Sequence, residues 1–329
     1  MPTYDIYGIG NALVDVEYRV SEDLLLLTGF PKGNMTLTNL TKRRSLSQLL
    51  EEKCKDQALK FSGGGSAANT LVAASQSGSK AFYSCKVGND DRGEFFLEEI
   101  RDQGIASNAV PQNGYTGECI SMVTPDAERT MVTNLGISEE FSENDLKPEA
   151  LRESKILYIE GYLISSREGL NAVLKAQTIA KSAGVKIALT LSDPTMVNNF
   201  KTSFNTIFNV GIDILFCNDE EAMLWTNTTT REKASLVIRE SCSAFAITCG
   251  KDGVIISEGD KTSHIPGVSV TPVDTTGAGD NFAGAFLARL CQGFGFKEAA
   301  IFANRSASIL VKHLGSRYSA SMLEELKNS

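Results

Sequence analysis

The sequence Val273-Asp274-Thr275-Thr276-Gly277-Ala278-Gly279-Asp280-Asn281-Phe282 decides which fold and chemistry we expect of this chain. Small residues stand at the start of an apolar helix. The backbone N–H groups of Gly277, Ala278 and Gly279 are therefore expected to converge with the positive end of the helix dipole on an anion. Asp280, a carboxylate beside that anion site, is suited to act as general base on a hydroxyl nucleophile.

A purely structural interpretation of the same stretch stays open. Gly277 and Gly279 could form a tight turn, and Asp280 could be a first-turn residue favoured by the helix dipole. Two glycines at a helix start forfeit helix propensity of about 1 kcal/mol each, which favours the functional interpretation.

Outside this stretch, short β-rich apolar runs alternate with longer amphipathic segments, which is typical of βαβ units and a mainly parallel sheet covered by helices. The expected strands are 5–8, 81–87, 156–160, 187–191, 214–217, 244–248 and 254–257. The expected helices are 67–77, 93–103, 167–183, 231–241, 277–292 and 296–312. We expect an α/β fold in a single domain over residues 1–329.

Two stretches, 12–38 and 115–135, interrupt this alternation. Both contain β-rich, partly alternating sequence without a helical pattern, so we interpret them as strands of a small separate sheet over the main domain. Such a sheet would be a lid that excludes water from a reacting centre. Extra edge strands without motion are the alternative.

The composition excludes several classes of protein. A net charge of -8 argues against nucleic-acid binding, because that affinity depends on clustered Lys and Arg. The dense basic run at 42–44 is expected to be a solvated helix start. No window approaches the ~18 apolar residues of a membrane span, and no signal-peptide pattern is present, so we expect a cytoplasmic protein without membrane contact. Seven scattered cysteines indicate neither a disulfide framework nor a zinc site.

Two further glycine clusters lie near the N-terminus. Gly64, Gly65 and Asn69 open an expected helix, where a ligand can approach the backbone, but a flexible turn explains this cluster equally well. The run 8–15 could be mistaken for a dinucleotide fingerprint, yet Leu13 replaces the third glycine and a strand pattern follows. A P-loop is excluded, since Gly-x-x-x-x-Gly-Lys-Ser/Thr does not occur.

The run from Asp274 to Phe282 closely resembles the signature of the ribokinase family, the phosphofructokinase-B-type carbohydrate and nucleoside kinases. The resemblance implies a three-layer α/β/α ribokinase-like fold with a mainly parallel central sheet and a small β-sheet lid. It also implies an ATP- and Mg²⁺-dependent kinase. In that family the final Asp is the catalytic base and the glycine-motif amides hold the transferring phosphoryl group; these roles fall on Asp280, Gly277, Ala278 and Gly279.

The resemblance also implies further site residues. The substrate would be bound by Asn11, Asp15, Gly64, Gly65, Asn69 and Arg129. The nucleotide would be bound by Asn218, Thr248, Gly250, Gly253 and Asn304. Asn218 and Glu221 would organise Mg²⁺ through water, and Asp274 and Thr276 lie where some members bind a monovalent cation such as K⁺.

Within the family, Gly10–Asp15 and Tyr158–Leu163 resemble the adenosine kinase branch, with Arg129 in a matching lid segment. The expected reaction is phosphorylation of the 5′-hydroxyl of adenosine. Phe30, Met35, Leu135 and Tyr162 are apolar candidates for a wall against the base. The alternatives are a sugar or sugar-acid kinase acting on ribose, fructose or 2-keto-3-deoxygluconate, and a non-catalytic binding protein on the same fold. Either a monomer or a homodimer is compatible with the resemblance.

Overall fold

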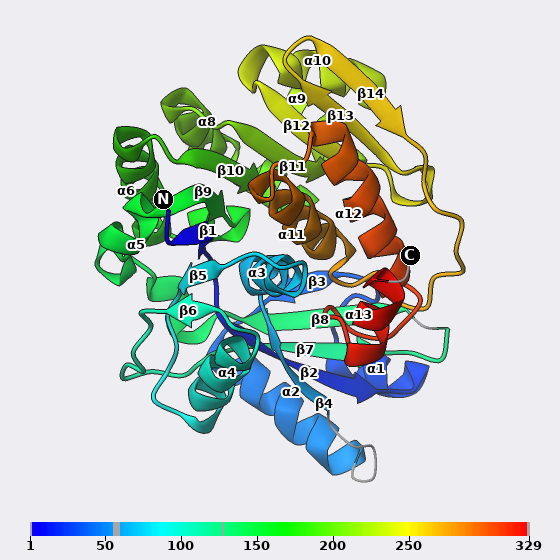
Figure 1. Ribbon diagram of the computed structural model, residues 1–329. Coiled ribbons are helices and arrows are strands. Elements are labelled where there is room, and N and C mark those ends of the chain that lie inside the picture. Colours follow the sequence, from blue (N-terminus) through cyan, green and yellow to red (C-terminus); the bar gives the residue numbers. More distant parts are fainter. Residues whose placement is uncertain (1, 55–59, 127, 328–329) are drawn as a thin grey trace.

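The computed structural model describes residues 2–54, 60–126 and 128–327, which form two β-sheets and the helices around them (Figure 1). The strands of the larger sheet are β1 (Tyr4–Ile9), β5 (Ala81–Ser84), β6 (Ala106–Ser107), β9 (Ser154–Ile159), β10 (Lys186–Thr190), β11 (Ile214–Asn218), β12 (Ala244–Thr248), β13 (Val254–Glu258) and β14 (Lys261–Ile265). Their spatial order is β14-β13-β12-β11-β10-β9-β1-β5-β6. The strands from β12 to β6 in this order pair in parallel, whereas β13 and β14 add an antiparallel edge.

Helices cover both faces of this sheet, which confirms the predicted three-layer α/β/α fold. One face packs against α3 (Ser66–Gln76), α4 (Asp91–Asp102), α11 (Ala278–Cys291) and α12 (Phe296–Leu310). The other face packs against α5 (Pro148–Arg152), α6 (Arg167–Ala183), α7 (Pro194–Asn199), α8 (Lys201–Val210), α9 (Asp219–Thr226) and α10 (Arg231–Ser241). The last helix, α13 (Ala320–Lys327), packs on α12. Among the helices of the described ranges, none has the length and apolar character that crossing a bilayer requires.

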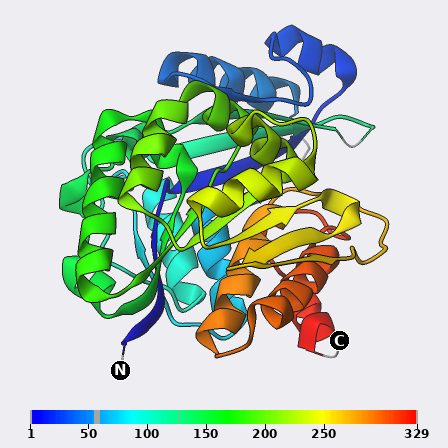
Figure 2. The same cartoon turned by 90° about the horizontal axis from the view of Figure 1, so that it is seen from above.

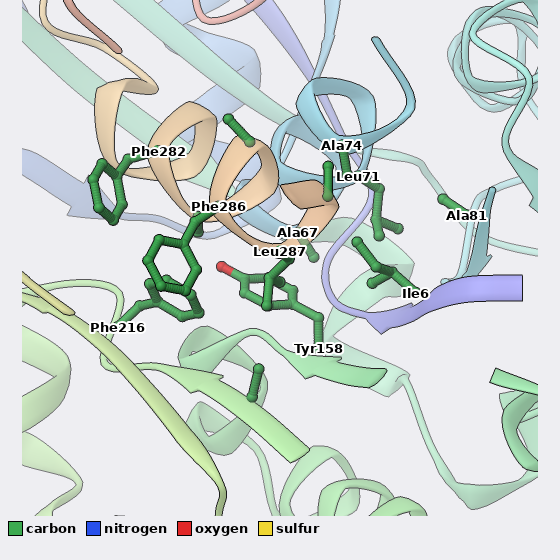
Figure 3. Packing of buried hydrophobic residues seen from close by; sticks show 14 of the residues in the cluster. Ile6, Ala67, Leu71, Ala74, Ala81, Tyr158, Phe216, Phe282, Phe286 and Leu287 are labelled. Carbon is green, nitrogen blue, oxygen red and sulfur yellow. The ribbon is translucent and has the colours of Figure 1, made fainter. Parts of the chain in front are cut away.

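The core under α3 and α11 sets the position of both helices. Phe282 and Phe286 of α11 lie over Phe216 of β11, with ring centroids 5.5 Å apart between Phe216 and Phe286 (Figure 3). The two helices approach closely at Gly284, where a Cβ would lie 2.1 Å from the carbonyl oxygen of Thr70. The helices therefore begin at the same edge of the sheet.

The smaller sheet is the predicted lid. It contains β2 (Leu13–Arg19), β3 (Met35–Leu37), β4 (Lys60–Gly64), β7 (Gly117–Val123) and β8 (Arg129–Asn134), in the order β3-β8-β7-β2-β4. Two helices, α1 (Glu22–Thr28) and α2 (Leu40–Lys53), pack on it around a separate small core, and Figure 2 shows them at the periphery of the molecule. Four of these strands lie in the predicted stretches. Strand β4 and helix α1 were not predicted, and of α2 only a helix start at 42–44 was expected.

The expectation of a purely strand-like segment at 12–38 is wrong where α1 interrupts it. This helix has only seven residues, too few for a helical period to be evident in the sequence. Its ends are fixed locally, because the Ser21 side chain accepts a hydrogen bond from the Leu24 N–H and Gly29 closes the helix in the left-handed conformation.

A buried ion-pair cluster anchors the lid to the main domain. Glu118 of β7 is 2% exposed and pairs with Arg43 of α2 at 2.5 Å and with Arg92 of α4 at 2.7 Å. The basic run at 42–44 is indeed in a helix start, but the expectation that it is solvated is wrong for Arg43. Its partner lies 75 residues away in the sequence and was not recognisable as one.

We predict that Glu118→Gln lowers the free energy of unfolding by about 3–5 kcal/mol, because it leaves two guanidinium groups without their buried counter-charge. Urea unfolding monitored by circular dichroism measures this. Glu52→Gln, in an exposed ion pair on α2, is the control and should change the stability little. Equal effects of the two substitutions would contradict the anchoring role.

Candidate active site

A cavity of about 360 Å³ lies where the carboxyl ends of the parallel strands meet the first turns of α3 and α11, beneath the lid. Ligands of open α/β sheets bind at this edge. The predicted site residues that line it are Asn11, Asp15, Gly65, Asn69, Asn218, Glu221, Thr248, Thr276, Gly277, Ala278, Gly279 and Asp280. The predicted residues that do not line it are Gly64, Arg129, Gly250, Gly253, Asp274 and Asn304.

The start of α11 presents free amides to this cavity. Gly277, at φ +73°, ends the preceding loop in the left-handed conformation and caps the helix without a side-chain hydrogen bond. The Ala278 N–H donates to the carbonyl oxygen of Thr275 at 3.2 Å. Among the described residues, nothing accepts a hydrogen bond from the backbone N–H groups of Gly277, Gly279 and Asp280. These three amides can therefore donate to an anion at the helix N-terminus.

Asp280 extends from the same turn, and both of its carboxylate oxygens have protein donors. The Ser66 hydroxyl donates to Oδ1 at 2.7 Å and the Asn69 side-chain amide donates to Oδ2 at 3.2 Å. Burial raises the pKa of Asp280 above its ordinary value, and these two hydrogen bonds together with the charge of Arg317 act in the opposite direction. A carboxylate in this setting is a better proton acceptor than one in water.

Asp15 lies in β2, on the lid side of the cavity. Burial raises its pKa to about 7, and the charge of Arg317 opposes that rise. A Cβ on Gly64, in the neighbouring strand β4, would lie 2.2 Å from the Asp15 Oδ1. Gly64 thus leaves room for the Asp15 carboxylate instead of lining the cavity itself.

Glu160 is a buried carboxylate at the end of β9, and it organises the loop after β1. It is 1% exposed and accepts hydrogen bonds from the Asn11 side-chain amide at 2.8 Å, the Asn11 backbone N–H at 3.3 Å and the Ala67 backbone N–H at 2.8 Å. Burial raises its pKa to about 7. Glu160 therefore fixes which atoms Asn11 presents to the cavity.

Asn218 and Glu221 form a capping box at the start of α9. The Asn218 side chain accepts from the Glu221 N–H at 2.7 Å, and the Glu221 carboxylate accepts from the Asn218 N–H at 3.0 Å. Burial raises the pKa of Glu221 to about 7. Among the described residues, no group of three or more His, Cys, Asp and Glu side chains could hold a metal ion. This pair of oxygen donors fits an ion such as Mg²⁺, which keeps most of its waters.

The remaining predicted nucleotide residues lie around the end of β12. Thr248 lines the cavity, whereas Gly250 is in the exposed turn that follows. Gly253, at φ +97°, packs so tightly that a Cβ would lie 2.1 Å from the carbonyl oxygen of Ile265. Asn304 of α12 donates to the carbonyl oxygen of Pro266 at 2.7 Å. Gly253 and Asn304 thus have structural contacts of their own.

Arg129 of the lid strand β8 forms an ion pair with Asp274, which lies in the loop before α11. The Arg129 Nη2 lies 2.7 Å from the Asp274 Oδ2 and 3.0 Å from a Glu17 carboxylate oxygen. Asp274 also accepts from the Thr276 N–H at 3.0 Å and the Gly315 N–H at 2.7 Å. Because a guanidinium already neutralises Asp274, these residues do not fit a monovalent cation in this conformation.

Comparison with known proteins identifies the family. Residues 34–322 match the family described as pfkB family carbohydrate kinase. The chain belongs to the pfkB carbohydrate kinase family. It is 31% identical to the adenosine kinase from Sinorhizobium meliloti, with 99% of each chain covered and a TM-score of 0.90. It is 30% identical to a probable sugar kinase protein from Rhizobium etli CFN 42, with a TM-score of 0.92, 100% of this chain and 99% of that chain covered.

Among curated relatives, the ribokinase of Haemophilus influenzae is 30% identical over 83% of this chain and 89% of its own length. The protein is thus a pfkB kinase, a phosphotransferase that phosphorylates an alcohol group of a sugar or a nucleoside. Kinases of this family use ATP, typically with Mg²⁺. The free amides of α11 fit the phosphates of ATP, and the Asn218–Glu221 pair fits the hydrated metal.

Several site residues of this pfkB kinase were not predicted, among them Ser66, Glu160, Ser192 and Arg317. Ser66 lies between Gly65 and Asn69, and Glu160 lies within Tyr158–Leu163, so their positions at a helix start and a strand end could have marked them. Arg317 has no local signal, because its partner Asn69 lies 248 residues away in the sequence. Ser192 lines the cavity in the left-handed conformation at φ +72°, which is uncommon for a residue with a side chain and is not visible in the sequence.

We predict that Gly279→Ala weakens ATP binding without lowering the stability of this pfkB kinase. A Cβ at Gly279 would meet no protein atom within 4 Å, so the added methyl group would occupy only the space beside the free amides. The KM for ATP should rise at least about tenfold, because the methyl group displaces the bound phosphates. A displacement of about 1 Å can lower activity by about 10²-fold. Steady-state kinetics and thermal unfolding measure the two effects.

Gly277→Ala is the matched control with the opposite expectation. Its φ is +73° and a Cβ would lie 2.6 Å from the Ser316 Cβ, so this substitution should destabilise the fold by about 1–3 kcal/mol. A loss of stability in Gly279→Ala, or an unchanged KM for ATP, would contradict the assignment of the free amides to phosphate.

Proposed function

We propose that the protein transfers the γ-phosphoryl group of Mg·ATP to the 5′-hydroxyl of adenosine. The observation that supports this acceptor is the apolar wall of the cavity. Met35, Leu37, Met131 and Leu135 extend from the lid and Tyr162 from the main domain. The flat aromatic face of a nucleobase can cover such side chains, whereas a free sugar presents hydroxyl groups to them. Of the four candidates for this wall, Phe30 instead packs in the lid core.

The polar residues between this wall and Asp280 suit a ribose. The Asp15 carboxylate can accept hydrogen bonds from a vicinal diol, and Asn11 and Asn69 are buried amides that both donate and accept. Gly65, at φ +90°, has no room for a Cβ beside the Asn11 carbonyl oxygen, so the chain turns sharply here into α3. The sugar would thus lie between the lid strand β2 and the first turn of α3.

The chemistry follows from the position of Asp280. Bound Mg·ATP supplies an electrophilic γ-phosphorus and neutralises charge on the phosphate oxygens. Asp280 accepts the proton of the attacking hydroxyl on a carboxylate oxygen. The amides of Gly277, Gly279 and Asp280 donate to the oxygens on which negative charge develops. The lid covers the cavity and restricts the access of water, whose attack would hydrolyse ATP.

A sugar or sugar-acid kinase is the second candidate. Its support is the likeness to the Haemophilus influenzae ribokinase and to the Rhizobium etli probable sugar kinase protein. The catalytic part of the proposal is the same for both candidates, because it depends on α11 and Asp280 and not on the wall.

The test is an acceptor screen with Mg·ATP, in which ADP release is coupled to an optical signal. The acceptors are adenosine, other nucleosides, ribose, fructose and 2-keto-3-deoxygluconate. We expect the highest kcat/KM for adenosine and a 5′-monophosphate as product, identified by ³¹P NMR. A kcat/KM higher for a free sugar than for every nucleoside would contradict the proposed acceptor.

A variant of the wall sharpens this screen. Met131→Gln is close in size to the natural side chain but polar, so it should raise the KM for a nucleoside about tenfold. Any residual turnover of ribose serves as the internal control and should not change. Equal effects on both acceptors would exclude a role of the wall in binding a base.

A further inference from the structure

Arg317 is a buried charge beside the site, in the loop between α12 and α13. Only 10% of its side chain is exposed. Its Nε donates to the Asn69 Oδ1 at 2.9 Å and its Nη1 donates to a Glu99 carboxylate oxygen at 2.7 Å. A Cβ on Gly63 would lie 2.6 Å from Nη1, so the guanidinium is held tightly under β4. Its Nη2 is buried without a partner among the described residues.

The guanidinium decides which way the Asn69 amide faces. Arg has five donors and no acceptor, so the amide oxygen of Asn69 must point to Arg317. The amide nitrogen then points to Asp280, whose Oδ2 lies 3.2 Å away. The reversed amide would place its oxygen against the carboxylate, where two acceptors repel each other. Asn69 donates to Asp280 because Arg317 occupies the other side of its amide.

We propose that Arg317 is a positioning residue for phosphoryl transfer: it orients Asn69 and thereby holds the Asp280 carboxylate in the position from which it accepts the proton. This inference rests on the proposed role of Asp280 as the base. Ser66 holds the other carboxylate oxygen and lies on the same helix as Asn69. Arg317 thus completes a chain of contacts from Glu99 of α4 through α3 to the first turn of α11.

The charge of Arg317 also favours the ionised form of the site. The titratable groups that face Asp280 are Asp15, Glu160, Glu221, Tyr158, Tyr162 and Arg317. In this set Arg317 is the cation and the others are acids. It opposes the burial that raises the pKa of both Asp280 and Asp15, and at Asp15 the charge of Arg129 acts in the same direction as Arg317 while Glu99 acts against them. Removing it should therefore raise both pKa values.

The sign of the pH effect follows. The base must be deprotonated, so kcat/KM falls as the pH falls through the pKa values that the coupled carboxyls share. Without the Arg317 charge this acidic limb should move to higher pH. An opposite charge at close range shifts a carboxyl pKa by about 1–3 units, so we expect a shift of the limb by about one pH unit or more.

The experiment compares three variants with the wild type over the pH range, using the acceptor with the highest turnover. Arg317→Gln removes both the positive charge and the guanidinium donors Nε and Nη1, which contact Asn69 and Glu99. Its limb should shift upward and its kcat should fall about 10–100-fold, as a misplaced catalytic group predicts, with the KM for ATP unchanged. Arg317→Lys keeps the charge, so its limb should stay while kcat still falls. Glu99→Gln leaves Arg317 on Asn69, so its limb should not move upward.

Two outcomes would overturn the role of Arg317. In the first, Arg317→Gln shows an unmoved limb and a kcat within twofold of the wild type, with only a lower melting temperature, as a structural role predicts. In the second, Arg317→Lys has the full kcat of the wild type. That result would contradict the role, because the single nitrogen of a lysine does not reproduce the two guanidinium nitrogens that contact Asn69 and Glu99. The second outcome remains decisive if Arg317→Gln does not fold.

A separate result identifies failure of the proposed function. If Asp280→Asn keeps its turnover, then Asp280 is not the base and the proposed mechanism fails. If Asp280→Asn is inactive but the Arg317 variants behave as the wild type, only the role of Arg317 fails. Calorimetric titration of the acceptor without ATP adds a readout that is independent of turnover. Arg317→Gln should bind the acceptor with a pH dependence shifted upward, because Asp15 loses the same charge.

Discussion

Helices α3 and α11 lie so close at Gly284 that the backbone of Thr70 takes the place of a side chain. This contact brings two helix N-termini, separated by more than 200 residues, to one edge of the sheet. Ser66 and Asn69 of α3 thereby reach the Asp280 carboxylate of α11. Phe282 and Phe286, buried against Phe216, hold α11 in this position from below (Figure 3). The geometry of the base thus depends on packing far from any ligand.

The site also brings several negative charges close together. A kinase of this family binds a highly anionic nucleotide next to carboxylates, and here burial raises the pKa of Asp15, Glu160, Glu221 and Asp280 together. Burying an unpaired charge is costly. Three of these carboxylates are accordingly matched with specific donors: three N–H groups for Glu160, the α9 capping box for Glu221, and Ser66 and Asn69 for Asp280. Arg317 supplies positive charge for the pair that faces the acceptor.

The sequence was sufficient for the parts of the fold that depend on neighbouring residues. The central strands, the helices α3, α4, α6, α10, α11 and α12 and the glycine turn before Asp280 have local signals and lie where they were predicted. The shorter helices α5, α7 and α8, which also connect strands of the larger sheet, were not predicted. The lid was less predictable. Its strand β4 is rich in glycine and is stabilised by antiparallel pairing with β2, and α1 is too short to show a period. The pairs Arg43–Glu118 and Arg317–Asn69 join residues that are distant in sequence, so no local pattern could identify them.

The central claim is that Asp280 accepts the proton of an acceptor hydroxyl beside the free amides of α11. The most direct measurement is the kcat of Asp280→Asn at saturating Mg·ATP and acceptor, together with calorimetric affinities for both ligands. The account predicts a kcat lower by about 10²–10⁴-fold, the contribution of a general base, with both affinities retained. A kcat within tenfold of the wild type would contradict it, because catalysis would then not require the carboxylate that the site is built to hold.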